Sequence, residues 1–138
     1  YIHFQSVLMG YQYIYSYMVK GGANEISSLA QDVIDSATLG IQTEPDGPGQ
    51  HMMRHILEGA ESLKNAKNVS ERQEAFASIS DALFPFFKLW PNQLMRSRLK
   101  ICRCKSGHQW LQPDNCPTAC PYSLNKSSNC LTIEETIY

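Results

Sequence analysis

Cysteine is the residue type with the clearest chemical potential in this chain, and all five cysteines lie beyond residue 101. They form the pattern Cys102-Arg-Cys104, Cys116-Pro-Thr-Ala-Cys120 and Cys130, with His108 between the first two groups. Thiolates are soft donors that favour Cu(I), Zn(II) and iron–sulfur clusters, so this cluster is a candidate metal site. Two disulfides with one remaining thiol are the rival interpretation, and the spacing alone leaves both open.

The segment His51-Met-Met-Arg-His55 is a second candidate for metal binding. Its two imidazoles stand one helical turn apart, so their rings can meet on one helix face, and Met52 adds a thioether. Methionines at this spacing usually pack in a core, however, and histidines near a helix start are usually solvated. The pattern therefore favours a structural role over a metal site.

Composition narrows the class of protein further. With 138 residues, 43% hydrophobic residues and 18% charged residues, the chain fits one globular domain. Its net charge of −1 gives no overall attraction to nucleic acid. No run approaches the roughly 20 apolar residues that a membrane helix needs, so we expect no membrane span. No nucleophilic triad, phosphate-binding loop or carboxylate pair stands out, and we expect no enzyme activity.

Helical periodicity dominates the first ninety residues. Apolar residues recur at helical spacing between Phe4 and Met18, and Gly21-Gly22 ends that stripe. A second helix is expected to begin near Asn24, which is an acceptable N-cap residue. Glycine and proline are dense over residues 40–49, so we expect a loop there.

Two further helices are expected before the cysteines. The third should cover residues 50–66, and the fourth should begin at Ser70, which forms a capping-box pattern with Gln73. Pro85 lacks an amide hydrogen and should kink or end the fourth helix.

The character of the sequence changes after residue 91. Leu99 and Ile101 alternate with polar residues as in a short half-buried strand, and residues 108–112 could return as a second strand. The rest of this region should be irregular and held by cross-links. We therefore expect a mainly α fold: an up-and-down bundle of about four helices over residues 1–91. A small cysteine-rich β or irregular appendage, residues 92–138, should pack on that bundle as part of one domain.

Several short motifs resemble a known bacterial domain family of unknown function. Members of this family carry a helix with Arg, Phe and Ser in order, then Cys-Pro-Met, Trp-Leu-Ser or Trp-Leu-Gln, Asn-Pro-Tyr and Met-x-x-Cys-Gly. Here the corresponding residues are Arg72, Phe76 and Ser80, Cys102, Trp110-Leu111-Gln112, Pro121-Tyr122 and Cys130. The family occurs alone or as the C-terminal heavy-metal-binding domain of periplasmic copper/silver efflux adaptor subunits. The resemblance covers roughly residues 60–131.

The chain also departs from the family pattern. Arg103 and Cys104 replace the Pro and Met that follow the first cysteine, and Cys120 replaces the Asn before Pro-Tyr. Ser127 stands at the late methionine, and Leu131 replaces the final glycine. A thiolate in place of a thioether keeps a soft donor, so a metal site could survive with altered preference. The added cysteines could equally have converted such a site into a disulfide knot.

The resemblance implies an extracytoplasmic accessory domain that captures Cu(I), and less favourably Zn(II), and hands it on by thiolate exchange. The implied ligands are Cys102, Cys104 and Cys130, with Cys120, Cys116 and His108 as further candidates. The alternative is a non-catalytic, disulfide-stapled structural or interaction module. In that case the partner protein or second copy would contact the tyrosine-rich first helix or the basic stretch 88–105. That helix carries tyrosines at positions 11, 13, 15 and 17, with a further one at position 1.

Overall fold

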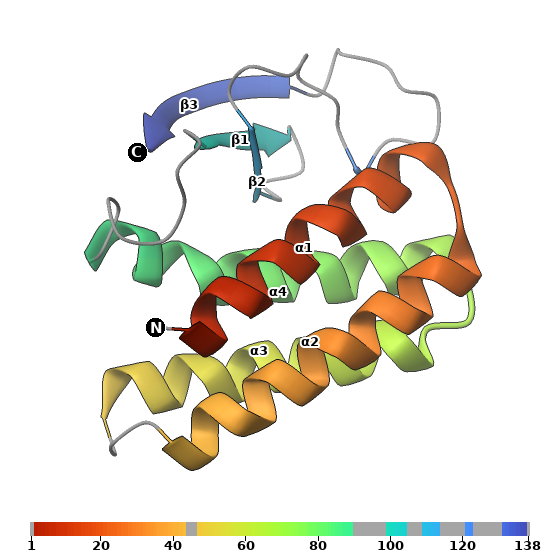
Figure 1. Cartoon of the computed structure of the whole chain (residues 1–138). Coiled ribbons are helices and arrows are strands. Elements are labelled where there is room, and N and C mark those ends of the chain that lie inside the picture. The colour runs from red at the N-terminus through yellow and green to blue at the C-terminus, as the bar shows by residue number, and fades with distance from the viewer. Residues whose placement is uncertain are drawn as a thin grey trace.

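The computed structural model describes residues 2–43, 47–89, 99–104, 109–113, 121–122 and 131–137 of the chain. These residues form four helices followed by a three-stranded sheet (Figure 1). The helices are α1 (Ile2–Lys20), α2 (Ala23–Thr43), α3 (Pro48–Asn65) and α4 (Val69–Leu89). The strands are β1 (Leu99–Cys104), β2 (Gln109–Pro113) and β3 (Leu131–Ile137). The prediction of a mainly α helical bundle is confirmed.

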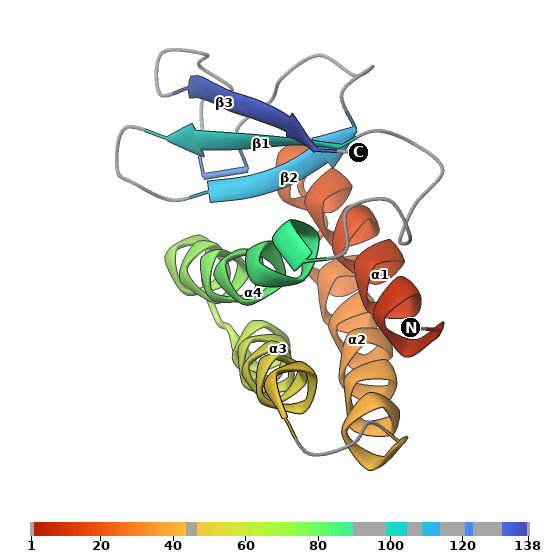
Figure 2. The same ribbon diagram turned by 90° about the vertical axis from the view of Figure 1, so that its left-hand side faces the viewer.

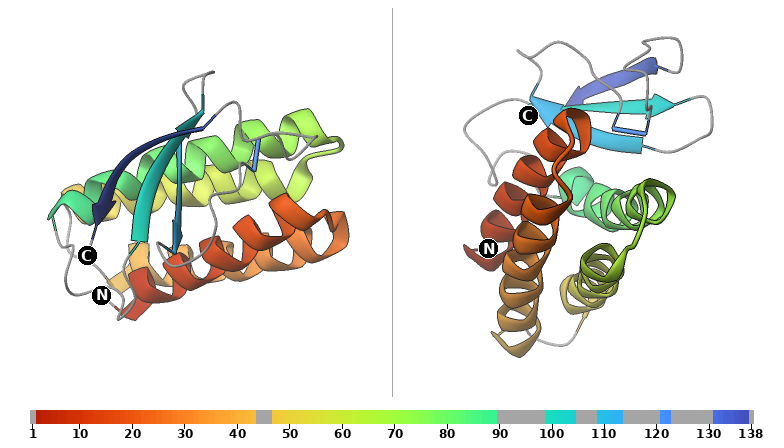
Figure 3. Two further views of the ribbon diagram at one scale, coloured as in Figure 1. Left: turned by 90° about the horizontal axis from the view of Figure 1, so that it is seen from above. Right: turned by 90° about the vertical axis from the view of Figure 1, so that its right-hand side faces the viewer.

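The helices pack in chain order, α1 on α2, α2 on α3 and α3 on α4. The sheet lies across α1 and α4, while α2 and α3 form the layer farther from it (Figures 1 and 2). The view from above shows the strands passing over both α1 and α4 (Figure 3). Strand β2 makes the contacts between the sheet and these two helices. The surface between the bundle and β2 is therefore where the cysteine-bearing region meets the rest of the molecule.

The apolar stripes read from the sequence form the core. Each helix contributes fully buried side chains, among them Phe4, Val7, Leu8, Tyr11 and Ile14, then Ala30, Val33 and Ala37, then Ile56, Ala60 and Leu63, and finally Phe76, Ile79 and Leu83. The same cluster continues into the sheet through Cys102, Trp110 and Leu111. In the part of the chain that the structure describes, no helix combines the length and apolar character that crossing a bilayer requires.

The first interhelical turn agrees with its glycine pair. Gly21 adopts a φ of 89°, a left-handed conformation that favours glycine, and α1 ends just before it. The following helix begins at Ala23, and the amide of Ile26 donates to the carbonyl of Gly22 at 3.0 Å. Gly22 therefore occupies the cap position that we expected for Asn24.

The loop expected over residues 40–49 is shorter than predicted at both ends. Helix α2 runs through Gly40 to Thr43, and α3 begins at Pro48. Gly40 is buried where a Cβ would lie 3.3 Å from the Met53 side chain, so this glycine permits close helix packing and makes no turn. Proline is compatible with the first helical turn, where an amide hydrogen has no intrahelical acceptor. The glycine that turns the chain is Gly47, with a φ of 155°.

The cap of α4 lies two residues before the predicted one. The side-chain oxygen of Asn68 accepts the Glu71 amide at 2.9 Å, and the Glu71 carboxylate accepts the Lys67 amide at 2.8 Å. The first bond is the N-cap bond of a capping box on Asn68 and Glu71, while the second goes to the amide one residue before the cap. Asparagine is as good an N-cap residue as serine, so the sequence allowed α4 to begin at either Asn68 or Ser70.

Of the two outcomes expected at Pro85, a kink or the end of the helix, the end does not occur, because α4 continues to Leu89. Pro85 itself is exposed, whereas Leu83 and Phe84 directly before it are buried in the core. The burial of these two neighbours stabilises the helix and offsets the backbone hydrogen bond that Pro85 cannot donate.

The sheet has the order β2-β1-β3, with both pairs antiparallel. The two strands predicted around residues 99–102 and 108–112 are confirmed as β1 and β2. Strand β3 was not predicted, because residues 131–137 were expected to be irregular. Its apolar residues Leu131, Ile133 and Ile137 alternate with polar ones, and the exception is Glu135. The register against β1 shifts at Glu134, pairing Ile101 with Glu135 and Cys102 with Ile133, as in a β-bulge.

Candidate functional site

Cys102 is the one candidate ligand whose side chain lies among the described ones. It is fully buried in the middle strand, paired with Trp110 of β2 and with Ile133 of β3. It belongs to the continuous hydrophobic core, so its sulfur is not accessible to solvent in this arrangement. Buried cysteine commonly acts as a small apolar residue, and the environment of Cys102 fits that role.

Cys104 lies at the end of β1, and the backbone pairing there bears on the other candidates. Cys104 pairs with Leu131, and Arg103 pairs with Gln109. In the sequence, Leu131 directly follows Cys130, and Gln109 directly follows His108. The strands that follow two candidate ligands thus both begin at the end of the sheet where Cys104 stands.

The remaining candidate ligands, Cys116, Cys120, Cys130 and His108, lie outside the described residues, as does the side chain of Cys104. Among the side chains that are described, no three His, Cys, Asp or Glu residues form a group that could hold a metal ion.

The tryptophan motif of β2 is a structural element. Trp110, Leu111 and Gln112 are all fully buried against the helices. The Gln112 side-chain oxygen accepts two hydrogen bonds, from the Tyr15 hydroxyl at 2.9 Å and from the Trp110 indole nitrogen at 3.0 Å. Burying a glutamine is costly unless its polar atoms are paired, and these two donors supply that pairing.

The Tyr11 hydroxyl forms the second polar contact between helix and strand. It accepts the Leu111 amide at 3.0 Å and lies 2.7 Å from the Ser80 hydroxyl. Ser80 has one hydrogen and donates it to the Phe76 carbonyl at 3.0 Å. Tyr11 must therefore donate to Ser80, and the chain of donors runs from Leu111 through Tyr11 and Ser80 to Phe76.

This position also perturbs the acidity of Tyr11. Burial raises the pKa of the Tyr11 hydroxyl strongly above its ordinary value, because the phenolate would lose its hydration. Hydrogen bonding with Ser80 and Leu111 opposes that rise only in part. Tyr11 is therefore neutral at physiological pH and serves as a hydrogen-bonding residue.

Tyr122 adds a further contact to the packing of strand β2 on the helices. Its hydroxyl donates to the Gln109 carbonyl at 2.7 Å, and its ring packs against Trp110 with centroids 5.8 Å apart. Phe76 lies between the two layers, with its centroid 6.0 Å from that of Tyr122 and 4.7 Å from that of Tyr11. We call this contact the bundle–sheet joint. It comprises Tyr11, Tyr15, Phe76, Ser80, Trp110, Leu111, Gln112 and Tyr122. Most of the residues that carry the family resemblance are thus explained by the joint.

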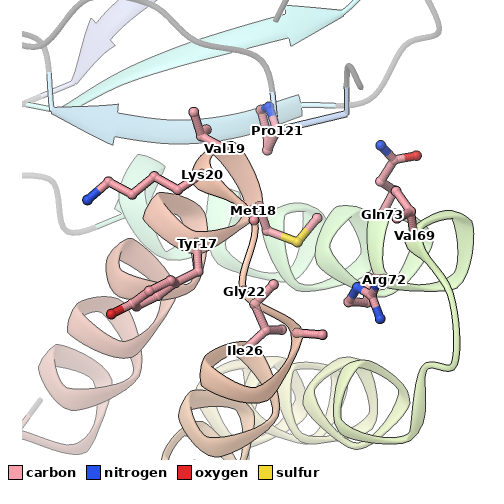
Figure 4. Close-up of a pocket in the computed structure, with 12 residues that line it drawn as sticks. Tyr17, Met18, Val19, Lys20, Gly22, Ile26, Val69, Arg72, Gln73 and Pro121 are labelled. Carbon is pink, nitrogen blue, oxygen red and sulfur yellow. The ribbon is translucent and has the colours of Figure 1, made fainter. Parts of the chain in front are cut away.

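A hollow of about 230 Å³ lies beside the joint, at the turn between α1 and α2 (Figure 4). Pro121 covers one side of it, and Gln73 and Arg72 of α4 lie on another. Figure 4 shows the Lys20 amine extending away on the side opposite Arg72, with Met18 between them. The two cations therefore do not converge, and the hollow lacks the donor arrangement of an anion site.

The tyrosines of α1 fall into two groups. Tyr11 and Tyr15 are buried in the joint, whereas Tyr13 is 54% exposed. Met9 lies one helical turn before Tyr13 and is equally exposed. The surplus of tyrosine is therefore structural for two residues, and only a small apolar surface remains on this helix.

No family model matches the chain, and no curated protein or solved structure is similar enough to match it. The resemblance to heavy-metal-binding adaptor domains stays a prediction based on the sequence motifs.

Proposed function

We propose that this protein is a non-catalytic, extracytoplasmic metal-binding module of a heavy-metal efflux or handling system. It binds Cu(I), and less favourably Zn(II), through Cys104, Cys130 and His108 at one end of the sheet. Cys116 and Cys120 are further candidate ligands. The supporting observation is the strand register, which pairs Cys104 with Leu131 and its neighbour Arg103 with Gln109.

The chemistry of these donors suits the proposed ion. Thiolates and imidazole are ligands for Cu(I) and Zn(II), and the three donors come from three separate segments of the chain. A site assembled from strand ends on a rigid sheet can accept and release an ion through ligand exchange with a partner's thiolates. No bond of an organic substrate is made or broken in that exchange, so the module needs no catalytic group.

The burial of Cys102 gives it a different role in this proposal. Its side chain belongs to the core, so removal of its sulfur should weaken packing before it weakens metal binding. The site then centres on Cys104, and Cys102 supports the strand that carries it.

The test is a Cu(I) competition titration of the full chain against a coloured Cu(I) chelator under reducing conditions. Cys104→Ser and Cys130→Ser should each weaken Cu(I) binding at least about tenfold, since each removes one ligand. Cys102→Ala is the matched control and should retain the affinity and the stoichiometry. Parent-like binding by both serine variants would refute the proposed site, as would an intact mass showing both cysteines in disulfides.

A second candidate function has one observation in its favour. Met9 and Tyr13 are large, exposed and one turn apart on α1, as expected if this helix contacts a protein partner or a second copy of the chain. Most of the basic stretch 88–105, the other surface considered for such contact, lies outside the described residues. Sedimentation velocity should then show association that Tyr13→Lys abolishes, whereas a concentration-independent profile for the parent would exclude self-association.

A further inference from the structure

His51 and His55 face one another on the first turns of α3. Their Nε2 atoms are 3.1 Å apart, and the rings meet edge to face with centroids 4.5 Å apart. Both side chains are exposed at the surface. Methionine packing and solvation were the roles expected for this segment, and the convergence of the two nitrogens is a feature that neither role requires.

The distance between the nitrogens fits ligation of a single ion. With metal–nitrogen bonds of about 2.0–2.1 Å, two nitrogens 3.1 Å apart subtend an angle of about 95–100° at the metal. That angle lies between the values of about 90° and about 109° for neighbouring ligands in square-planar and tetrahedral sites. Without an ion, a hydrogen bond from one imidazole N–H to the other ring spans the same distance. A metal would therefore replace the shared proton without separating the two nitrogens, and each ring would turn so that its Nε2 lone pair points at the ion instead of along the line between the nitrogens.

Glu58 lies near the second ring nitrogen of His55. Its carboxylate lies 4.0 Å from Nδ1 of His55 on the same helix. At this distance the carboxylate makes no hydrogen bond with His55, but its charge on this side favours a proton on Nδ1 over one on Nε2. Ligating histidines in metalloproteins commonly donate their second nitrogen to a carboxylate, and Glu58 lies on that side of His55.

A hollow between α3 and α4 adjoins the pair and has room for an ion with its waters. Its volume is about 450 Å³, and its lining combines His51, Met52 and His55 of α3 with Ser78, Asp81, Ala82 and Pro85 of α4. Within the described side chains, no third His, Cys, Asp or Glu joins the two histidines to make a three-ligand group. The remaining coordination positions would therefore be open to water or to an external donor.

We propose that His51 and His55 form a second metal site that binds a divalent, imidazole-preferring ion such as Zn(II), Cu(II) or Ni(II). The site differs from the proposed cysteine site in its place in the fold, on helix α3 instead of beside the sheet strands, and in its ligands, which are imidazoles without thiolates. Because two protein ligands leave coordination positions open, the ion it holds is exchangeable. The two proposed sites share no residue, so evidence against one of them is not evidence against the other.

The experiment is a Zn(II) titration of the full-length chain, followed by NMR of the histidine ring nitrogens. Zn(II) is diamagnetic, and the ring signals of His51 and His55, assigned separately from that of His108 with a His108→Gln variant, report on this site even when the cysteine site also binds metal. Zn(II) should shift the Nε2 resonances of His51 and His55 together while leaving those of His3 unchanged. His51→Gln or His55→Gln should each weaken binding at the remaining imidazole by about 10²-fold, since the chelate is lost.

Two matched variants sharpen the result. His3→Gln removes a histidine from another helix and should leave the Zn(II)-induced shifts intact. Glu58→Gln should weaken Zn(II) binding by up to about tenfold without abolishing it. The proposal is overturned if excess Zn(II) leaves both Nε2 resonances in place, or if saturation is reached only at millimolar Zn(II). It is also overturned if His51→Gln leaves the shift of His55 unchanged.

Discussion

Removal of one oxygen atom in the bundle–sheet joint should destabilise the whole protein. Tyr11→Phe keeps the ring and its stacking on Phe76, but it deletes the acceptor of the Leu111 amide and the donor to Ser80. A buried amide left without an acceptor costs about 1–3 kcal/mol, and the lost bond to Ser80 adds about 0.5–1.5 kcal/mol. We therefore expect Tyr11→Phe to lower the free energy of unfolding by about 2–4 kcal/mol.

The directed chain of hydrogen bonds makes a sharper prediction for the double variant. Ser80→Ala alone should cost about 1 kcal/mol, because the buried Tyr11 hydroxyl then loses the oxygen to which it donates. In Tyr11→Phe/Ser80→Ala that hydroxyl is already absent, so the second substitution should cost less than it does alone. The two free-energy changes should fall short of additivity by about 0.5–3 kcal/mol, as for other residues in direct contact.

Urea unfolding followed by tryptophan fluorescence, to which buried Trp110 contributes, measures these changes. Tyr13→Phe is the matched control, because Tyr13 is on the same helix but 54% exposed, and its cost should stay within about 0.5 kcal/mol. A Tyr11→Phe variant as stable as Tyr13→Phe would refute the account of the joint. Strict additivity in the double variant would refute the energetic coupling between the Tyr11 and Ser80 hydroxyls.

Three further predictions concern other parts of the structure. Folding raises the pKa of Tyr11, so the stabilising contribution of its neutral hydroxyl is fully present below the unfolded tyrosine pKa of about 10 and is lost as the pH rises further. The urea midpoint of unfolding should therefore fall above about pH 10, and it should fall less in Tyr11→Phe. Asn68→Ala should lower the free energy of unfolding, measured in a thermal melt, by about 1 kcal/mol, because Asn68 caps α4. Ser70→Ala should lower it far less. The reverse order would indicate that Ser70 is the cap, as the sequence predicted. Gly59→Ala should lower the free energy of unfolding by about 1–3 kcal/mol, because its Cβ would lie 2.7 Å from a side-chain atom of α4. Gly49→Ala is the control: its Cβ would have no neighbour within 4 Å, so it should be neutral or stabilising. Equal effects of the two substitutions would contradict this helix packing.

The joint gives the resemblance motifs a physical meaning. Phe76, Trp110, Gln112 and Tyr122 hold the sheet on the bundle through stacking and paired hydrogen bonds. Their side chains are occupied by these contacts, so they position the cysteine-bearing strands and need not bind an ion themselves. The departures from the resemblance pattern fall at Arg103, Cys104, Cys120, Ser127 and Leu131, and none of these residues belongs to the joint.

Local spacing was sufficient to predict much of this fold. The four helices and the pairing of β1 with β2 follow from apolar periodicity and turn residues, because both depend on neighbours within a few positions. The same signals were ambiguous at helix ends. Asn68 and Ser70 are both good caps, and Gly40 suits a turn as well as it suits a close helix crossing.

Tertiary structure decided the features whose partners lie far away in the sequence. Gln112 reads as a polar strand residue, yet Tyr15, 97 positions earlier, makes its burial possible. Residues 131–137 alternate apart from Glu135, but only pairing with β1, about thirty positions earlier, makes them a strand and brings Leu131 beside Cys104. The histidine pair shows the division most clearly: the sequence places His51 and His55 one turn apart, but only the packed helices turn the rings together beside a hollow. Local periodicity determines which elements form, whereas burial, pairing and side-chain orientation depend on contacts that exist only once the chain has folded.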